Sequence, residues 1–273
     1  MGITVADINE LRQQTGAGMM DCKKALTEAD GNIEEAIAYL RKKGQKVSEL
    51  RAGRETTEGA VIAKVNESGN KGVIISLGCE TDFVAKNDSF VAFANQIADL
   101  ALTVNSMEEL RATSIDGLAF DEKIAEQVGR IGEKLDVKAF ETLEAEAVVP
   151  YIHAGNKIGV LVAMNKPANE TINATGKDVA MQVAAMNPVA VNEEGVPAEM
   201  VAKEKEIAVE KAKTEGKPEN IVEKIAEGTV KKYYKENTLI NQAFVKDGSK
   251  TVKQFVAEAE GGLEIVDFKR VSL

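Results

Sequence analysis

The spacing of apolar residues changes several times along this chain, and each change predicts a different kind of element. In the first 44 residues, apolar side chains recur every three or four positions, as they do on one face of an α-helix. This spacing predicts short helices over residues 6–12, 19–26 and 33–43, with Thr4 as the first N-cap and Gly44 as the stop of the last helix.

The next part of the chain predicts a linker and then a strand–strand–helix unit. Residues 42–58 are charged and contain two glycines, as linkers do. The apolar runs 61–65 and 72–77 predict two paired strands joined by a polar turn. Helical spacing returns over residues 90–102 and 122–129, so this unit extends from about residue 59 to residue 140.

The same order of elements returns from about residue 143. Strands are predicted at 148–153 and 158–163, and a helix is predicted at 177–186. Within the predicted helices, the sequence Phe-Ala-Asn-Gln-Ile-Ala at 93–98 is similar to Val-Ala-Met-Gln-Val-Ala at 179–184. Two related units are therefore expected.

A long helical hairpin is predicted inside the second unit, at about residues 197–235. Its two runs, 198–214 and 218–234, are rich in Ala, Glu and Lys, and Pro218 suits the first turn of the second helix. Such an arm either reaches a partner or a second copy, or is simply a solvated hairpin, and the sequence leaves these interpretations open. The thin apolar seam is formed by Val201, Ala208 and Ala212 on one helix and by Ile221, Ile225 and Val230 on the other.

Together these elements predict an α+β fold. A three-helix bundle with its linker occupies residues 1–52, a first core subdomain occupies 53–142, and a second core subdomain with the hairpin occupies 143–273. A helix at 251–259 and a strand at 263–268 close the chain.

Composition narrows the classes of function. The formal net charge is −10 and the pI is about 4.9, so direct nucleic-acid binding is disfavoured. No signal-like or membrane-spanning run is present, and we expect a cytoplasmic protein with no membrane contact. Cys22 and Cys79 form no Cys-x-x-Cys pair and His153 is the single histidine, so no metal site or cofactor is predicted.

The most informative short stretch is Thr81-Asp82-Phe83-Val84, which lies where the first unit passes from strand to helix. Loops on rigid scaffolds often carry function. The alternative interpretation is that Asp82 caps the helix and Phe83 folds back into the core. The second unit has no aromatic residue at the corresponding place, which favours a special role for the first copy.

A second candidate is the start of the predicted helix at 19–26. Met19 and Met20 are either core residues or an adaptable contact surface, and the sequence does not separate the two. The preceding Gly16-x-Gly18 follows a helix and has Asp21 where a third glycine would stand, so a dinucleotide site is rejected.

Residues 11–26, 81–87 and 239–244 together resemble the bacterial elongation factor Ts family. The similarity extends over nearly the whole chain. It implies a guanine-nucleotide exchange factor for elongation factor Tu, a first bundle similar to a ubiquitin-associated (UBA) domain, and a hairpin similar to the family's coiled-coil arm. Many family members continue with an extra C-terminal helix, so a contact made by that helix is expected to be absent here.

The resemblance also implies roles for individual residues. Thr81, Asp82, Phe83 and Val84 would reach the nucleotide site of Tu, displace Mg²⁺ and disturb the phosphate-binding loop. The docking residues would be Met19, Met20 and Lys23, with Ile131, Gly132 and His153 as weaker candidates at the core–partner face; for His153, a structural role at a strand end is the alternative.

Two other classes of function make different predictions for these residues. An enzyme using Asp82 with Lys86 or His153 has no paired carboxylates, metal cluster or nucleophile elbow in the sequence to support it. A polypeptide-binding adaptor built on residues 1–52 would leave Asp82 and Phe83 dispensable. An exchange factor instead predicts that Phe83 is essential for activity.

Overall fold

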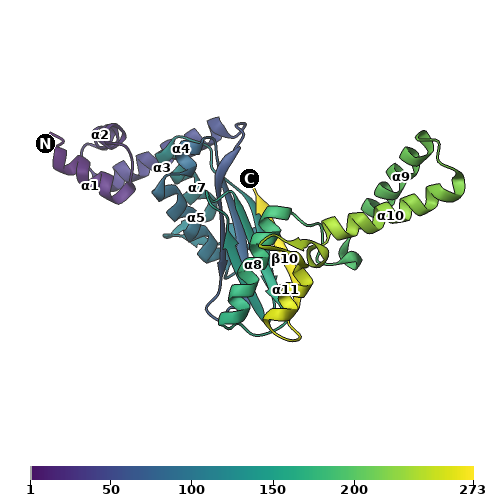
Figure 1. The fold of residues 1–273 in the computed structure, drawn as a ribbon. Helices are drawn as coiled ribbons and strands as arrows, with labels where there is room; N and C mark the ends of the chain where they lie inside the picture. Colours follow the sequence, from purple (N-terminus) through teal and green to yellow (C-terminus); the bar gives the residue numbers. More distant parts are fainter. Residues whose placement is uncertain (1) are drawn as a thin grey trace.

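The computed structural model describes residues 2–273 and begins with three helices (Figure 1). These are α1 (Val5–Thr15), α2 (Met19–Glu28) and α3 (Ile33–Arg51). A capping box between Thr4 and Asp7 starts α1, which satisfies backbone N–H groups that have no partner within the helix. The helices enclose a small core of their own, formed by Ile8, Leu11, Ala17, Cys22, Ala25, Leu26, Ala29 and Ala36.

The third helix does not stop at Gly44, so the predicted linker over residues 42–58 is wrong for residues 42–51, whereas residues 52–57 are irregular and do connect the helix to the first strand. The helix α3 continues to Arg51, with Gly44 buried in its interior. The reason is a close crossing with α7 (Phe120–Ile131), because a Cβ on Gly44 would lie 2.8 Å from the carbonyl oxygen of Ala125. Glycine is needed here because the two helices pack closely. From the sequence alone, the same glycine is interpreted as the end of the helix.

Two small antiparallel sheets form the centre of the molecule. The first has the order β1 (Glu58–Val65), β2 (Lys71–Cys79), β5 (Asp136–Glu144). The second sheet contains β6 (Ala147–Ile152), β7 (Ile158–Met164) and β10 (Ile265–Ser272), in the order β10-β7-β6.

The two sheets share one topology. In each, a hairpin is followed by a helix, and a later strand pairs with the second strand of the hairpin. This is the repeat predicted from the sequence, although β5 was not foreseen.

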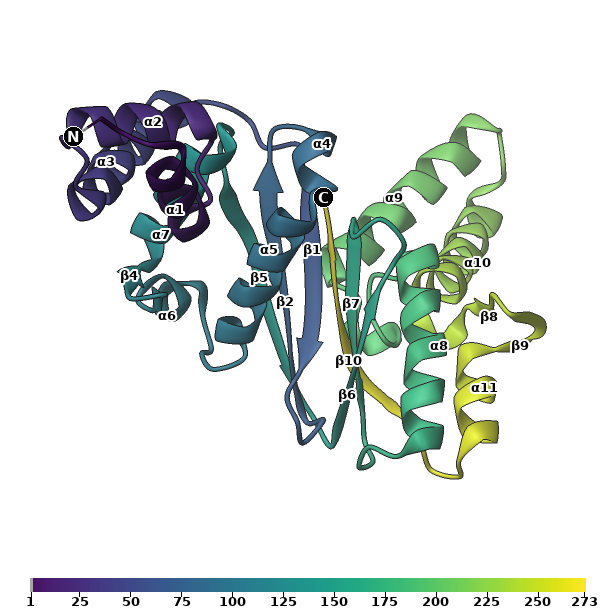
Figure 2. The same cartoon turned by 90° about the vertical axis from the view of Figure 1, so that its left-hand side faces the viewer.

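The sheets face each other, and a helix covers the outer face of each (Figure 2). Side chains from both sheets meet between them, for example Val61 and Ile74 of the first and Leu161 of the second. The outer face of the first sheet packs on α5 (Asp88–Ala101), and that of the second packs on α8 (Glu170–Met186). The layers are therefore helix, sheet, sheet, helix.

The helix α8 begins seven residues before the predicted start at residue 177. The side chain of Asn169 accepts a hydrogen bond from the backbone N–H of Ile172 and caps the first turn. The helical residues Asn173 to Lys177 include no large apolar side chain. The sequence therefore shows no helical spacing of apolar residues in this part of α8.

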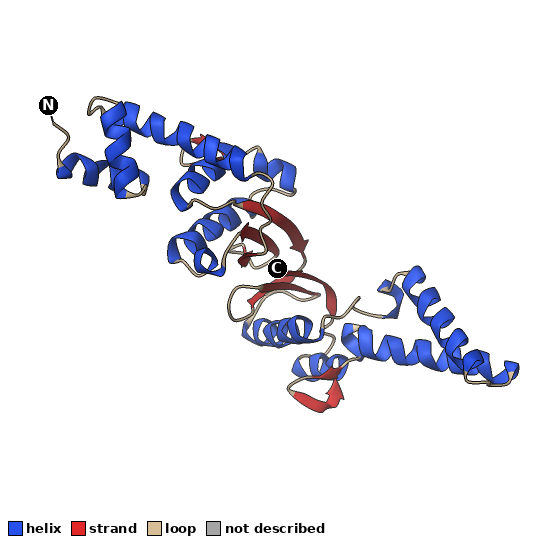
Figure 3. Ribbon diagram, turned by 90° about the horizontal axis from the view of Figure 1, so that it is seen from above, coloured by secondary structure: helices blue, strands red, loops and turns tan. Residues whose placement is uncertain are grey.

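The predicted hairpin region contains α9 (Ala198–Thr214) and α10 (Glu219–Asn237), which lie side by side and project away from the sheets (Figure 3). We call these two helices the arm. The predicted seam is partly wrong, because Ile221 is 41% exposed and Val222 is buried instead. The buried seam consists of Ala208, Ala212, Val222 and Ala226.

Shorter elements complete the chain. Two of them, α4 (Asp82–Ala85) and α6 (Met107–Arg111), belong to the first sheet's half of the molecule, together with β3 (Ser114–Ile115) and β4 (Leu118–Ala119). Near the C-terminus are β8 (Ala243–Phe244), β9 (Asp247–Thr251) and α11 (Val252–Ala259). Single 3-10 turns lie at Glu193–Gly195 and Leu239–Asn241. Within residues 2–273, no helix is both long and apolar enough to cross a membrane.

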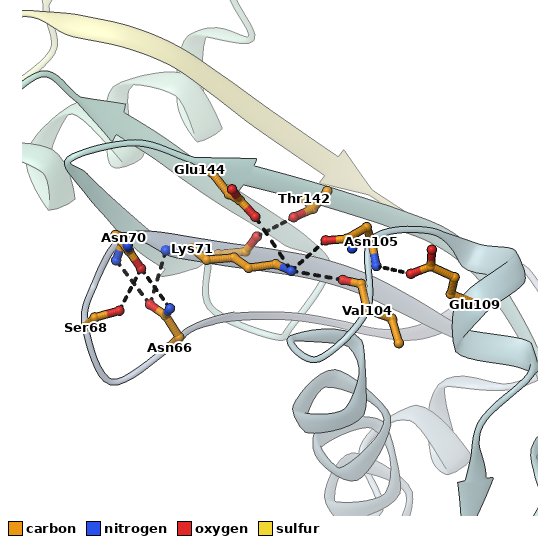
Figure 4. A network of polar contacts seen from close by, with 10 residues as sticks. Asn66, Ser68, Asn70, Lys71, Val104, Asn105, Glu109, Thr142 and Glu144 are labelled. Atoms are coloured by element: carbon orange, nitrogen blue, oxygen red, sulfur yellow. Dashed lines mark hydrogen bonds and ion pairs between the residues drawn. The ribbon is translucent and has the colours of Figure 1, made fainter.

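A polar network fixes the end of the first sheet at which β1 turns into β2 (Figure 4). The Nζ atom of Lys71 donates to the carbonyl oxygen of Val104 at 3.2 Å and to Oδ1 of Asn105 at 2.8 Å. The side chain of Asn66 accepts hydrogen bonds from the backbone of the same turn, including the N–H of Lys71. These contacts hold the segment after α5 against this end of the sheet. The opposite end of the sheet is where β2 leads into α4.

Candidate functional site

The helix α4 lies at this opposite end, directly after β2, and holds most of the Thr81–Val84 stretch. The hydroxyl of Thr81 caps α4 by accepting from the backbone N–H of Val84 at 3.5 Å. Val84 and Ala85 pack against the first core, whereas Phe83 is 84% exposed. The alternative in which Asp82 caps the helix and Phe83 folds into the core is therefore wrong.

One carboxylate holds the base of this stretch. Oε2 of Glu133 accepts from the backbone N–H groups of Glu80 and Thr81, both at 3.0 Å. Its other oxygen accepts from the hydroxyl of Thr81 at 2.6 Å. Hydrogen bonds to an ionised acceptor are among the stronger ones in proteins, so the turn into α4 has a defined backbone position.

A second carboxylate makes the reverse connection. Oε1 of Glu80 accepts from the backbone N–H of Lys134 and from the guanidinium of Arg51, both at 2.7 Å. The hydrogen bond from Lys134 is the main cause that lowers the pKa of Glu80, and Arg51 adds to it. The end of α3, the segment after α7 and the Thr81–Val84 stretch therefore meet at one point.

Sequence reasoning missed Glu80, Glu133 and Arg51. Their contacts join positions that are 29 to 54 residues apart, and each residue alone looks like an ordinary charged surface residue. The only available signal was the position of Glu80 immediately before the Thr81–Val84 stretch and of Glu133 immediately after Ile131-Gly132.

Asp82 pairs with a residue on its own helix. Nζ of Lys86 donates to Oδ2 of Asp82 at 2.7 Å, one helical turn away. This hydrogen bond lowers the pKa of Asp82 and raises the pKa of Lys86. Both groups are at the surface, so the pair stays accessible to an approaching partner.

The weaker candidates for contact with a partner, Ile131, Gly132 and His153, lie at the same end of the sheets. Gly132 adopts a left-handed conformation (φ 83°), which ends α7 and turns the chain toward Glu133, and Ile131 packs on the first core. His153 begins the turn between β6 and β7 and is exposed, with its Nδ1 atom 3.0 Å from the hydroxyl of Tyr151.

This turn is joined to the first sheet close to α4. Nζ of Lys157 pairs with Oε2 of Glu58 at 2.8 Å, and Glu58 is the strand partner of Cys79 at the end of β2. We call this end of the two sheets the rim, defined by the Thr81–Val84 stretch, Ile131, Gly132 and the turn from His153 to Lys157.

Met19, Met20 and Lys23 lie elsewhere, on α2 in the N-terminal bundle (Figure 2). Met19 is 52% exposed, Met20 is 75% exposed, and Lys23 is exposed as well. Their interpretation as core residues is therefore wrong, and they are available for contact. The structure thus presents two separate groups of candidates, one on α2 and one on the rim.

The chemistry of the rim is that of a contact surface. An exposed phenyl ring stands beside an ion-paired carboxylate on a base fixed by backbone hydrogen bonds. The nearest thiol, Cys79, is buried, and burial raises its pKa to about 12. An aromatic side chain on a fixed base is well suited to insertion between apolar groups of another protein.

Comparisons with known proteins give one family. A family model described as Elongation factor TS matches residues 80–273. The chain is 55% identical to an Elongation factor Ts of Amoebophilus asiaticus over 273 residues, which cover 99% of each sequence. It is 53% identical to that of Christiangramia forsetii, over 99% of this chain and 98% of the relative. It is 41% identical to that of Porphyromonas gingivalis, over 100% of this chain and 99% of the relative.

Proposed function

The chain belongs to the elongation factor Ts family, and from this premise we propose that it is the guanine-nucleotide exchange factor of elongation factor Tu. In this role it acts in translation elongation in the cytoplasm, promotes the release of GDP from Tu, and leaves when GTP binds. It carries out no bond-making chemistry of its own.

The observation that supports this proposal most directly is the state of Phe83. Its ring is 84% exposed, while the backbone that carries it is held by Glu133 and by the packing of Val84. A side chain that is already presented in a defined position loses less conformational entropy on binding. We therefore assign to Phe83 the role of inserting between helices of Tu.

Asp82 acts beside it. Mg²⁺ bridges the nucleotide phosphates and protein oxygens and offsets their mutual repulsion. We assign to Asp82 the role of competing for this ion or its water shell, and to the whole Thr81–Val84 stretch the role of disturbing the phosphate-binding loop. The hydrogen bond from Lys86 lowers the pKa of the Asp82 carboxyl below its usual value of 3.8.

Docking is assigned to the N-terminal bundle and to the rest of the rim. The bundle, residues 1–52 and similar to a UBA domain in this proposal, presents Met19, Met20 and Lys23 to the GTPase domain of Tu. The subdomains 53–142 and 143–273 carry the rim, whose Ile131, Gly132 and His153 add contacts. Methionine side chains adapt to irregular apolar surfaces, and the exposure of Met19 and Met20 supports this assignment.

The energetics require several contacts. Each tenfold gain in the rate of GDP release corresponds to about 1.4 kcal/mol. Burial of a phenyl ring provides roughly 2–3 kcal/mol. By linkage, GDP must weaken the binding of this protein to Tu by the same factor by which the protein weakens GDP.

The test is the release of a fluorescent GDP analogue from Tu, followed by stopped flow with catalytic amounts of this protein. We expect strong acceleration by the wild type and a loss of roughly 30- to 150-fold in Phe83→Ala, which is the rate equivalent of the lost burial. The matched control is Val245→Ala, since Val245 is also exposed but lies between β8 and β9, away from the rim.

Two outcomes would contradict the proposal. Wild-type rates in both Asp82→Ala and Phe83→Ala would remove the roles given to these side chains. No acceleration by the folded wild-type protein, with active Tu, would favour the adaptor function, in which Met19 and Met20 bind a polypeptide and the rim has no part.

A further inference from the structure

We propose that Glu133 is the positioning residue of the exchange site: its carboxylate holds the Thr81–Val84 stretch in the form that presents Phe83. The inference rests on the proposed function and adds a residue to its machinery. Glu133 itself touches neither nucleotide nor Mg²⁺ in this scheme. It acts through the backbone and the hydroxyl that it binds.

The need for such a residue follows from the end of β2. The ladder between β1 and β2 ends at Cys79, and the ladder between β2 and β5 ends at Gly78. The N–H groups of Glu80 and Thr81 therefore lie beyond both ladders, at a point where unpaired backbone donors are costly. One oxygen of Glu133 accepts from both of them at 3.0 Å.

The third bond fixes the start of α4. The hydroxyl of Thr81 donates to Glu133 at 2.6 Å and accepts from the N–H of Val84 at 3.5 Å. Glu133 thus binds the residue that caps α4. Because Phe83 is exposed, the packing of its own ring cannot hold it, and its direction depends on this cap together with the packing of Val84 and Ala85.

The connection is reciprocal, which makes it stiffer than a single contact. Glu80 accepts from the backbone N–H of Lys134, next to Glu133, and from Arg51 at the end of α3. Nζ of Lys134 in turn donates to the carbonyl oxygens of Ala52 and Arg54 at 2.8 and 2.9 Å. The C-terminal end of α3 is therefore held by the same group of contacts that holds the Thr81–Val84 stretch.

The first experiment is a double-mutant cycle on GDP release from Tu, with Phe83→Ala, Glu133→Ala and the double variant. We expect Glu133→Ala to lower the maximal release rate about tenfold, which is about 1.4 kcal/mol. The half-saturating concentration should change little, because the contacts of Met19 and Met20 are untouched. In the Phe83→Ala background, Glu133→Ala should cause a clearly smaller loss than in the wild type, since much of its effect acts through Phe83.

Additive losses in this cycle, or a loss confined to the half-saturating concentration, would overturn the proposal. Glu133→Gln is a second variant in case Glu133→Ala unfolds: its one carbonyl oxygen can still accept from the two backbone N–H groups, so we expect partial recovery of the rate. Glu122→Ala is the matched control, because Glu122 is an exposed carboxylate of α7 far from the end that carries Glu133.

The second experiment needs no partner and so separates this inference from the proposed function. The chain contains no tryptophan, so Phe83→Trp places a single fluorophore at the site. We expect its steady-state anisotropy to fall when Glu133→Ala is added, and the amide protons of Glu80 and Thr81 to exchange faster with solvent. Unchanged anisotropy and unchanged exchange would overturn the proposal even if the wild-type protein releases GDP as expected.

Discussion

Gly44 of α3 and Gly129 of α7 touch where these two helices cross. A Cβ on Gly129 would lie 2.5 Å from the Cα of Gly44, a separation that real Cβ atoms do not adopt. Two glycines at one crossing let the helix backbones come into direct contact. The crossing therefore attaches the N-terminal bundle to the first sheet's half of the molecule, and it does so within the part of α3 that the sequence had indicated as a linker.

Gly129→Ala should therefore destabilise the protein. The added methyl group must push α3 and α7 apart, and overpacking of this kind costs about 1–3 kcal/mol. The matched control is Gly228→Ala in α10, where a Cβ meets nothing within 4 Å. There alanine should stabilise the helix by about 0.5–1 kcal/mol, because glycine is the weaker helix former.

Urea unfolding followed by circular dichroism measures both variants. A Gly129→Ala protein as stable as the wild type would show that the helices can separate without loss. In that case the crossing does not constrain the bundle.

The ion pair between Asp82 and Lys86 should give a defined dependence of stability on pH. The folded pKa of Asp82 is lowered from 3.8, mainly by the hydrogen bond from Lys86, so its stabilising effect is complete above pH 3.8 and is lost as the pH falls through the folded pKa. The pKa of Lys86 is raised from 10.5, so its effect is complete below pH 10.5 and is lost as the pH rises through the folded value.

We therefore expect Asp82→Asn to be less stable than the wild type by a small, constant amount between these two limits. The difference should vanish in acid. Urea unfolding across pH tests this, since urea does not screen charges as guanidinium chloride would. A difference that persists at the lowest pH would mean that Asp82 stabilises the protein by something other than its charge.

The thiol of Cys79 should be unreactive in the native protein. Burial, and then the charge of Glu133, raise its pKa to about 12. At pH 8, only about one molecule in 10⁴ then carries the nucleophilic thiolate. Burial also raises the pKa of Cys22.

The measurement is labelling with an aromatic disulfide reagent at pH 8, with and without urea. Neither cysteine should react quickly in the folded protein, and both should react after unfolding. Rapid labelling of one thiol without urea, assigned by mass spectrometry, would show that the end of β2 opens locally.

Several elements were predictable because their apolar period is long and clear. The two helices of the arm and the strands β1, β2, β6 and β7 follow this rule. The repeat was predictable because the sequences at 93–98 and 179–184 are similar. The strand β5 was missed because a bulge, where its pairing with β2 shifts between Ser76 and Leu77, breaks its alternation of apolar residues. The helix α4 has four residues, which is too short for a helical period to show.

The candidate site was predictable only in part. The stretch at Thr81–Val84 could be found because its residues are adjacent in the sequence and its aromatic residue has no counterpart in the second unit. Glu133 could not be found, because its hydrogen bond to the Thr81 hydroxyl closes a loop of 52 positions. Gly44 was misread because a glycine after a helical run has the same pattern whether it ends the helix or allows another helix to approach.

The segments that enter and leave the arm lie side by side, although they are far apart in the sequence. The N–H of Val189 donates to the carbonyl oxygen of Asn237 at 2.8 Å, and the N–H of Leu239 donates to that of Ala190 at 2.8 Å. All six strands of the two sheets lie outside residues 190–238. The arm is therefore an insertion between α8 and β10, and a change in the length of its two helices leaves the order of the strands in both sheets unchanged.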